Sequence, residues 1–356
     1  MPVDDKLLRE AGILNDHPQN GPSMGGSRSH SLREGDSGMQ KNGLITVCDM
    51  PEPQTRRYVV PGLLPDGALS ILYGDGGLGK SYLALHLALC AALAHPFAGR
   101  PLEKHRTLYL DAELDQDEFV RRAYWAARGL GLEGPPEGLY YCRLPGSLND
   151  PNVRAHALAY KVECGADLVI IDSLTVASYG IDPKEARDII ALLKGLEEFG
   201  TVLAIDHIRT PEPGADISEY RPFGSAFKHH LARSLLMVTK GTSGAIAIRN
   251  TKANFDEKSA PLYLTLNIDK ENRRATVEWL EPGDERLVGM TAIPADERIV
   301  QTLARGEGGI STAQAIAQEL DLSKKTVSNH LTALRARGRV EPLGNARWRF
   351  LPDSLS

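Results

Sequence analysis

Cysteine, aromatic residues and long apolar runs are scarce in this sequence of 356 residues. Only four cysteines occur, widely spaced and without a CxxC pair, which excludes a disulfide scaffold, a zinc ribbon and an iron–sulfur site and predicts a reducing, cytoplasmic location. The longest apolar run, Tyr82–Ala94, is too short to span a bilayer, and the first residues lack the order of a secretory signal. We therefore expect neither a membrane protein nor a secreted one.

An excess of positive charge is also missing. The chain has 41 Lys and Arg against 46 Asp and Glu, a net charge of −5. A polycation is thereby excluded, so any contact with nucleic acid requires a local basic patch.

The length predicts roughly two domains, and changes of composition divide the chain further. Residues 1–57 are rich in Gly, Ser and Pro without an apolar period, which predicts a disordered or loosely docked arm. Residues 281–294 contain prolines and glycines and little pattern, as expected of a linker. The predicted domains are therefore residues 58–280 and 295–356.

Within residues 58–280, apolar runs of strand type alternate with helical patterns. Runs such as Leu168–Asp172 and Val202–Asp206 are typical of strands buried on both faces, which predicts an α/β fold with a mostly parallel central sheet flanked by helices. Further strands are predicted at Leu69–Tyr73, Thr107–Asp111, Leu235–Val238, Ala245–Arg249 and Tyr263–Ile268, and helices at Ser81–Leu93, Gln116–Arg128, Val153–Glu163 and Lys184–Phe199.

The segment Gly74–Ser81 fits the phosphate-loop pattern GxxxxGK[ST], between a predicted strand and a predicted helix. Glycines let backbone N–H groups surround phosphate oxygens, and the helix N-terminus adds partial positive charge. The residues expected to hold the nucleotide are Gly74, Gly76, Gly77, Gly79, Lys80, Ser81 and Tyr82.

Acidic residues end two of the predicted strands. Asp172 is our candidate for holding Mg²⁺ together with the Ser81 hydroxyl. Asp111 and Glu113 end the other strand, and alternate residues point to the same face, so either carboxylate can polarise the water that attacks a phosphate.

Together these segments resemble a RecA-like P-loop ATPase, and specifically the AAA-type, RepA-type hexameric helicases of plasmids and mobile elements. The resemblance is carried by Val59–Gly67, by Tyr109–Glu113 with Arg122 nine positions later, by Ala204–His207, by Gly224–Ala226 with Arg233–Ser234, and by Thr251–Phe255. It implies a RecA-like fold over about residues 58–280 and a homohexameric ring with ATP and Mg²⁺ bound between neighbouring subunits.

The resemblance also implies roles for single residues. Glu113 would be the general base and His207 would sense the γ-phosphate, while Lys80 contacts phosphate. Arg233 and Lys252 would complete the site of the adjacent subunit.

Each assignment has an alternative. Arg233 could be a surface residue of an amphipathic helix, Lys252 a solvated residue at a sheet edge, and His207 a core histidine. Arg122 could pair with Glu118 one turn earlier on its helix.

The C-terminal segment is predicted to form helices at Ala295–Arg305 and Thr312–Leu320, a third helix capped by Ser323 and ended by Gly338, and a hairpin with its turn at Gly344–Asn345. This order resembles prokaryotic winged-helix DNA-binding domains. From Leu322 to Leu351 seven basic residues stand against one acid, a local charge of +6. The residues expected to contact DNA are Lys324, Lys325, Ser328, Asn329, Arg347 and Arg349. A winged helix used for protein contacts is the alternative.

The sequence thus predicts an ATP-hydrolysing, DNA-associated motor, foremost a RepA-like hexameric replicative helicase or replication ATPase. In RecA-like rings the loops at 176–183 and 209–223 would face DNA, but the second contains Glu212, Asp216 and Glu219, which suit phosphate contact poorly. An ATP-dependent regulator or loader, or a recombination or defence ATPase that separates no strands, is therefore the alternative.

Overall fold

A computed structural model describes residue 52 and residues 55–180, 185–208, 221–222, 226–241, 243–287, 295–320 and 322–351. Nearly all of the predicted arm, most of the loop 209–223, the end of the loop 176–183 and half of the linker lie outside the described residues. The chain divides into two units between Arg56 and Arg57, and every described helix and strand belongs to the second unit.

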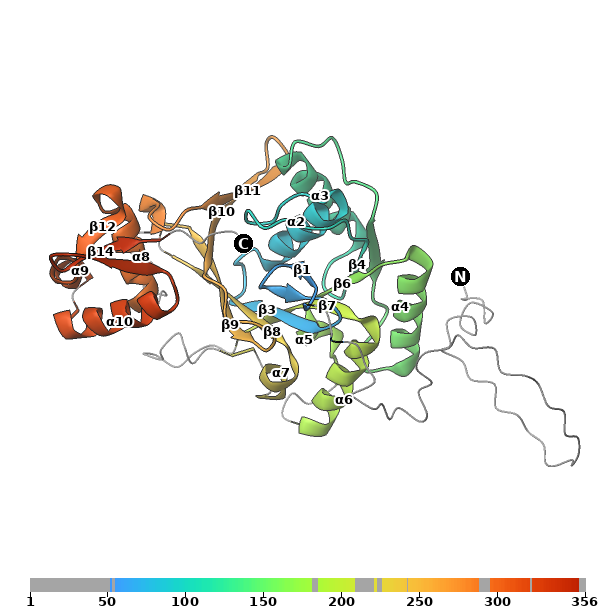
Figure 1. Cartoon of the computed structure of the whole chain (residues 1–356). Coiled ribbons are helices and arrows are strands. Elements are labelled where there is room, and N and C mark those ends of the chain that lie inside the picture. The colour runs from blue at the N-terminus through green and yellow to red at the C-terminus, as the bar shows by residue number, and fades with distance from the viewer. Residues whose placement is uncertain are drawn as a thin grey trace, which may run out of the picture. The chain divides into compact units, whose positions relative to one another are not determined.

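One nine-stranded sheet organises residues 69–280 (Figure 1). Six neighbouring strands are parallel, and three antiparallel strands extend the sheet on one side. In spatial order the strands are β11 (Arg274–Leu280), β10 (Leu262–Asp269), β9 (Ile246–Ala253), β8 (Ser234–Lys240), β3 (Leu69–Gly74), β7 (Thr201–His207), β6 (Leu168–Asp172), β4 (Thr107–Asp111) and β5 (Leu139–Arg143).

Helices cover both faces of this sheet, and each face has its own apolar cluster. One cluster contains α2 (Lys80–Leu93) and α3 (Gln116–Gly129). The other contains α4 (Pro151–Cys164), α5 (Leu174–Ala177), α6 (Ala186–Leu196) and α7 (Ala226–Leu231). Short elements complete this part: β1 (Tyr58–Val60) pairs with β2 (Leu64–Pro65), and 3₁₀ turns lie at Glu197–Phe199 and Glu285–Leu287. None of the helices in the described ranges combines the length and the apolarity needed to cross a bilayer.

The C-terminal part has a hydrophobic core of its own, built from three helices and a small sheet. The helices are α8 (Ala295–Arg305), α9 (Ala313–Leu320) and α10 (Lys324–Ala336), and a 3₁₀ turn lies at Glu307–Gly309. The sheet pairs β12 (Ile310–Thr312) and β13 (Val340–Leu343) with β14 (Arg347–Phe350). Ser323 caps α10 by accepting a hydrogen bond from the Thr326 amide, as the sequence predicts.

The α/β fold with a mostly parallel sheet is confirmed, and the predicted strands and helices are present within a few residues of their expected ends. Strands β5 and β11, strand β12 and helix α7 were not predicted, because their sequences are short or poor in apolar alternation. Strand β9 lies between β8 and β10, but β10 pairs only with Ile246–Ile248, so at Lys252 the ladder of β9 with described strands is on the β8 side alone.

The antiparallel extension meets helix α3 at its last residue, Gly129. A Cβ at this glycine would lie 1.8 Å from the carbonyl oxygen of Ala275 in β11, a distance that no atom pair tolerates. Only a residue without a side chain lets the helix end so close to the strand.

We expect Gly129→Ala to lower the free energy of unfolding by about 1–3 kcal/mol, because backbone atoms of α3 and β11 must separate to admit the methyl group. Urea denaturation measures this. Gly146→Ala is the matched control, since its Cβ would meet only a Val153 methyl at 3.4 Å. Equal midpoints for the two variants would contradict the close approach.

Candidate functional site

The phosphate loop connects β3 to α2 and is open where a phosphate would lie. Gly79, with φ of 84°, precedes the first residue of α2, and a Cβ there would lie 2.4 Å from a Leu266 methyl. At Gly76 and Gly77, by contrast, a Cβ would meet nothing within 4 Å. The exposed backbone of this loop and the N-terminus of α2 together form the kind of cradle that binds anions.

Lys80 is buried at this loop, with 5% of its surface exposed. Its Nζ donates hydrogen bonds to the carbonyl oxygens of Gly74 at 3.0 Å and Asp75 at 2.7 Å. Burial lowers the pKa of Lys80, while Asp172 and other nearby carboxylates oppose that shift. The ammonium group is therefore held within reach of the open cradle.

Asp172 lies 3% exposed at the end of β6 and touches the first turn of α2. The Tyr109 hydroxyl donates a hydrogen bond of 2.7 Å to its Oδ2, and the nearby Ser81 hydroxyl, like that of Tyr109, acts to lower the pKa of the carboxyl group. Burial raises the pKa of Asp172. A hydroxyl and a carboxylate in contact are ligands that Mg²⁺ accepts, so Ser81 and Asp172 fit the predicted metal site.

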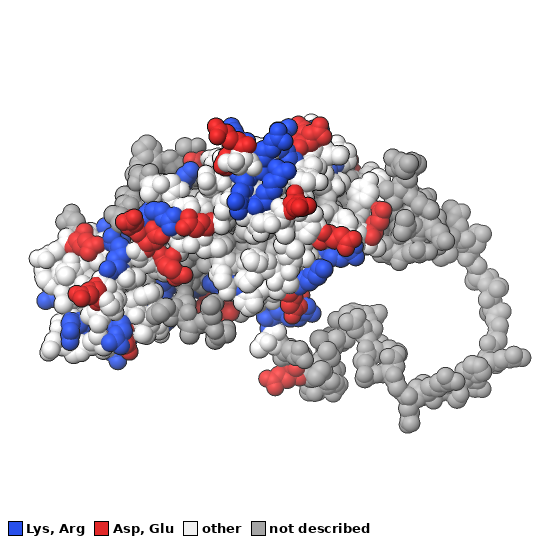
Figure 2. All heavy atoms as spheres, turned by 90° about the horizontal axis from the view of Figure 1, so that it is seen from above, with Lys and Arg blue, Asp and Glu red and all other residues white. Residues whose placement is uncertain are grey.

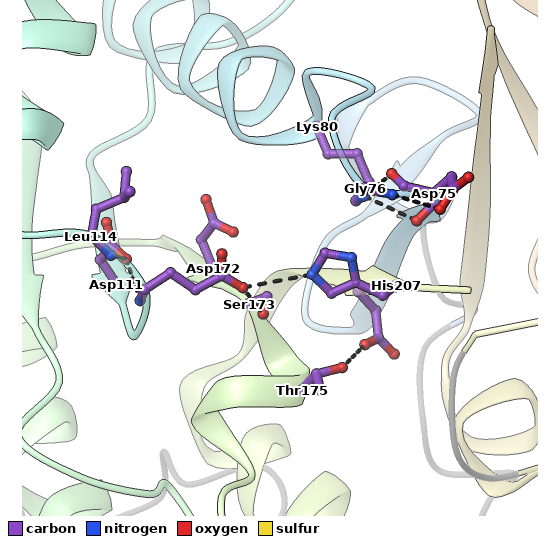
Figure 3. A network of polar contacts seen from close by, with 12 residues as sticks. Asp75, Gly76, Lys80, Asp111, Leu114, Asp172, Ser173, Thr175 and His207 are labelled. Atoms are coloured by element: carbon purple, nitrogen blue, oxygen red, sulfur yellow. Dashed lines mark hydrogen bonds and ion pairs between the residues drawn. The ribbon is translucent and has the colours of Figure 1, made fainter. Parts of the chain in front are cut away.

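Figure 3 shows His207 close to Lys80 and Asp172, and the contact between Glu113 and His207 places Glu113 with them. Glu113 Oε1 accepts a short hydrogen bond from the Ser173 hydroxyl and lies 3.6 Å from His207 Nε2. The side chains of Glu113 and His207 are 37% and 39% exposed, so both can reach a bound molecule.

The structure separates the two candidate bases. Asp111 is fully buried, and its Oδ1 accepts hydrogen bonds from the backbone amides of Glu113 at 2.8 Å and Leu114 at 2.9 Å. Its carboxylate thus shapes the turn that presents Glu113, and burial raises its pKa. Of the two, only Glu113 is exposed to the site.

Asp172 and His207 lie on the same face of the sheet because side chains alternate between the two faces along each strand. In β7, Leu203 and Ile205 belong to the cluster of α2, so His207 points to the same face. Asp172 follows Ile170 on that face of β6 in the same way. Val202 and Ala204 belong to the other cluster, and Asp206 therefore points away from the phosphate loop.

Arg233 and Lys252 lie near the amino ends of the parallel strands, whereas the phosphate loop of their own chain follows the carboxyl end of β3. The Arg233 amide donates to the Leu69 carbonyl at 2.8 Å, at the start of β3, whereas the loop follows Gly74 at its end. Five residues of strand separate the two levels by roughly 16 Å. Neither residue is therefore near the Lys80 of its own chain.

Lys252 also has a local structural contact. Its Nζ donates to the carbonyl oxygens of His229 at 2.6 Å, His230 at 2.9 Å and Ala232 at 2.7 Å, at the C-terminus of α7. Burial, and then the charge of Arg233, lower the pKa of Lys252.

Arg122 pairs with Glu118 at 2.7 Å on α3, as the alternative interpretation of the sequence expects. Its guanidinium carbon also lies 5.4 Å from the centre of the Tyr82 ring. Tyr82 therefore faces α3, beside rather than within the phosphate cradle.

In the C-terminal part, three of the seven basic residues are engaged within the fold. Arg337 pairs with Asp296 at 3.2 Å, Arg339 with Glu297 at 3.5 Å and Arg349 with Glu341 at 3.0 Å. The remaining four, which are exposed, are Lys324, Lys325, Arg335 and Arg347. Ser328 and Asn329 lie on the same helix as the two lysines. The positive face is thus smaller than the count of charges suggests.

Residues 45–212 match the model of a protein family described as AAA domain. This range contains the phosphate loop, Glu113, Asp172 and His207. These residues are therefore similar to an AAA domain. Among solved structures, the crystal structure of the RadB recombinase is similar, with 17% sequence identity over 62% of this chain and 93% of that chain and a TM-score of 0.45. No curated protein matches the sequence.

The sequence reasoning missed two hydroxyl groups of the candidate site. Tyr109 and Ser173 hold the carboxylates of Asp172 and Glu113. Both could have been predicted from their positions in the sequence. Ser173 follows Asp172 directly, and Tyr109 precedes Asp111 by two positions and therefore lies on the same face of β4.

The raised pKa of Asp172 predicts a pH effect on stability. The folded protein binds this proton more tightly than the unfolded chain, so the stability it contributes is present at low pH and is lost as pH rises through the folded-state pKa. We expect Asp172→Asn, which removes the buried charge, to raise the urea midpoint of the nucleotide-free protein at pH 7 and to flatten its pH dependence above about pH 4. The exposed Asp117→Asn is the control, and a lower midpoint for Asp172→Asn at pH 7 would contradict the prediction.

Proposed function

We propose that this protein is a Mg²⁺-dependent ATP hydrolase that acts on DNA as an oligomer. The observation that carries the proposal is the meeting of Lys80, the Ser81–Asp172 pair and Glu113 at one edge of the sheet. Bound Mg²⁺ would offset charge on the phosphates of ATP.

Each residue at that edge has a chemical task in hydrolysis. The loop amides and Lys80 bind the phosphates, and Ser81 and Asp172 hold the metal ion. The Glu113 carboxylate accepts a proton from the attacking water, and its contact with Ser173 fixes its orientation. His207, 3.6 Å from Glu113, senses whether the γ-phosphate is present.

Arg233 and Lys252 would then serve the site of a neighbouring subunit. Their distance from the phosphate loop of their own chain supports this arrangement. A cation at the amino ends of the strands is too far from the nucleotide of its own subunit and can contact only a nucleotide bound by a neighbour. Such a finger neutralises transition-state charge and makes hydrolysis depend on assembly, foremost as a hexamer.

DNA would bind through the C-terminal part. Figure 2 shows basic side chains interspersed with acidic ones on the visible face, so a broad positive field does not supply the contact there. Lys324, Lys325 and Arg335 on α10 and Arg347 on β14 are exposed and form no ion pair with another described residue, which suits them to phosphate contact, with Ser328 and Asn329 at base edges.

The leading version is a RepA-like hexameric replicative helicase or replication ATPase in the cytoplasm. The alternative, an ATP-dependent regulator or loader, or a recombination or defence ATPase, differs in that strands are not separated. Strand displacement on a forked duplex with ATP distinguishes the two: displacement favours the motor, and its absence with retained DNA binding favours the alternative.

We expect Lys80→Ala to abolish ATP hydrolysis and Glu113→Gln to lower kcat by about 10²–10⁴ because the proton acceptor is lost. Asp111→Asn is the matched control, since an amide oxygen can still accept the two turn amides; it should cost less than about tenfold. Phosphate release measures all three. A larger loss in Asp111→Asn than in Glu113→Gln would reverse the assignment of the base.

We expect the double variant Lys324→Ala, Lys325→Ala to weaken DNA binding and to reduce the slope of log K against log salt by about 1–2, one phosphate contact for each lysine. Fluorescence anisotropy of the full-length protein on duplex DNA measures the slope.

Arg337→Ala is the control for the lysine variant, because this arginine already pairs with Asp296 and should leave the salt slope nearly unchanged. An unchanged slope in the lysine variant, with full affinity, would remove α10 from the DNA contact and favour a role in protein contacts.

A further inference from the structure

Helix α7 is joined to β7, the strand that ends at His207, by a buried ion pair. Lys228 of α7 donates to Asp206 Oδ2 at 2.8 Å, and the exposed fractions of the two side chains are 2% and 0%. The other carboxylate oxygen of Asp206 accepts a hydrogen bond of 2.6 Å from Thr175. Both oxygens are thus engaged, on the face of the sheet away from the nucleotide.

The residue after Asp206 is His207, which faces the nucleotide site beside Glu113. Consecutive residues of a strand point to opposite faces, so a shift of the β7 end on one face moves the other face with it. A ligand that displaces His207 therefore also acts on Asp206 and, through the ion pair, on α7.

The other end of α7 is held by Lys252, whose Nζ contacts three carbonyl oxygens within residues 229–232. Arg233 follows at once. Its backbone is bonded on both sides, the amide to Leu69 and the carbonyl to the Asn254 amide at 3.0 Å. The short helix thus connects the carboxyl end of β7 with the base of Arg233.

We propose that α7 is a rigid connection through which the nucleotide site of one subunit controls the position of Arg233, with Lys228, Asp206 and Lys252 as positioning residues. This inference rests on the proposed function, in which Arg233 serves the neighbouring site. In it Lys252 caps α7 within its own chain, in addition to the role proposed for it above.

The test replaces the charges and keeps the hydrogen bond. Loss of one partner would leave a buried charge, so we choose the double variant Asp206→Asn, Lys228→Gln, in which the two amides can still bond. We expect its affinity for a fluorescent ATP analogue with Mg²⁺ and its KM to be unchanged, because Asp206 faces away from the cradle, while kcat falls at least about tenfold. Lys194→Gln, an exposed lysine on α6, is the control and should keep the full rate.

A comparison with Arg233→Ala decides whether the fall in kcat arises through Arg233. Arg233→Ala alone should lower kcat by on the order of 10³. Adding Asp206→Asn, Lys228→Gln should lower it no further than about twofold, because both changes remove the same contribution. Losses that multiply, or an unchanged rate in the Asp206, Lys228 variant, would overturn the inference while leaving the proposed function intact. A normal rate in Arg233→Ala would overturn the trans role and the inference together.

The variant Lys252→Met tests the role of Lys252 in holding α7. It also tests the inference independently if the double variant Asp206→Asn, Lys228→Gln does not fold. We expect faster hydrogen exchange of the α7 amides in the nucleotide-free protein, because the helix loses its cap, and Lys252→Arg should restore protection. A lysine that acted only on a neighbour's phosphate would leave this exchange unchanged, and that result would overturn the cap.

Discussion

The Lys80 ammonium group offsets negative charge at the carboxyl ends of the parallel strands. The carboxylates of Asp172, Asp75 and Glu113 all act on it, as does Asp206, which is itself paired with Lys228 on the other face of the sheet. Carboxylates so close together repel one another unless a cation lies among them. The phosphates of a nucleotide would bring more negative charge to this edge, which is why open loop amides and a divalent cation are needed there as well. Lys80 is therefore the cation that several carboxylates of this site share.

Much of this site could be predicted from the sequence because its signals are local. The phosphate loop is a short contiguous pattern, and Asp172 ends an apolar run that could only be a buried strand. Side-chain alternation predicted that Asp111 and Glu113 share a face but could not choose between them. The choice depends on which carboxylate the turn amides bind, and that is a matter of three-dimensional geometry.

The surroundings of Arg233 were beyond sequence reasoning for a different reason. Lys252 is separated from the carbonyl groups it caps by 20–23 positions, and Lys228 from Asp206 by 22. Such contacts leave no periodic signal. The number of basic residues in the C-terminal part misled in the same way, since Arg337 and Arg339 bind acids of α8 that precede them by about 40 positions.

The close approach at Gly129 has a consequence for how copies of the chain can associate. Helix α3 ends against the backbone of β11, the outermost strand on one side of the sheet. An outer strand with free amide and carbonyl groups invites another chain to pair with it, as in aggregates. Gly129 lies directly against the Ala275 carbonyl of β11, so the helix end covers this part of the strand and an added strand could not pair there.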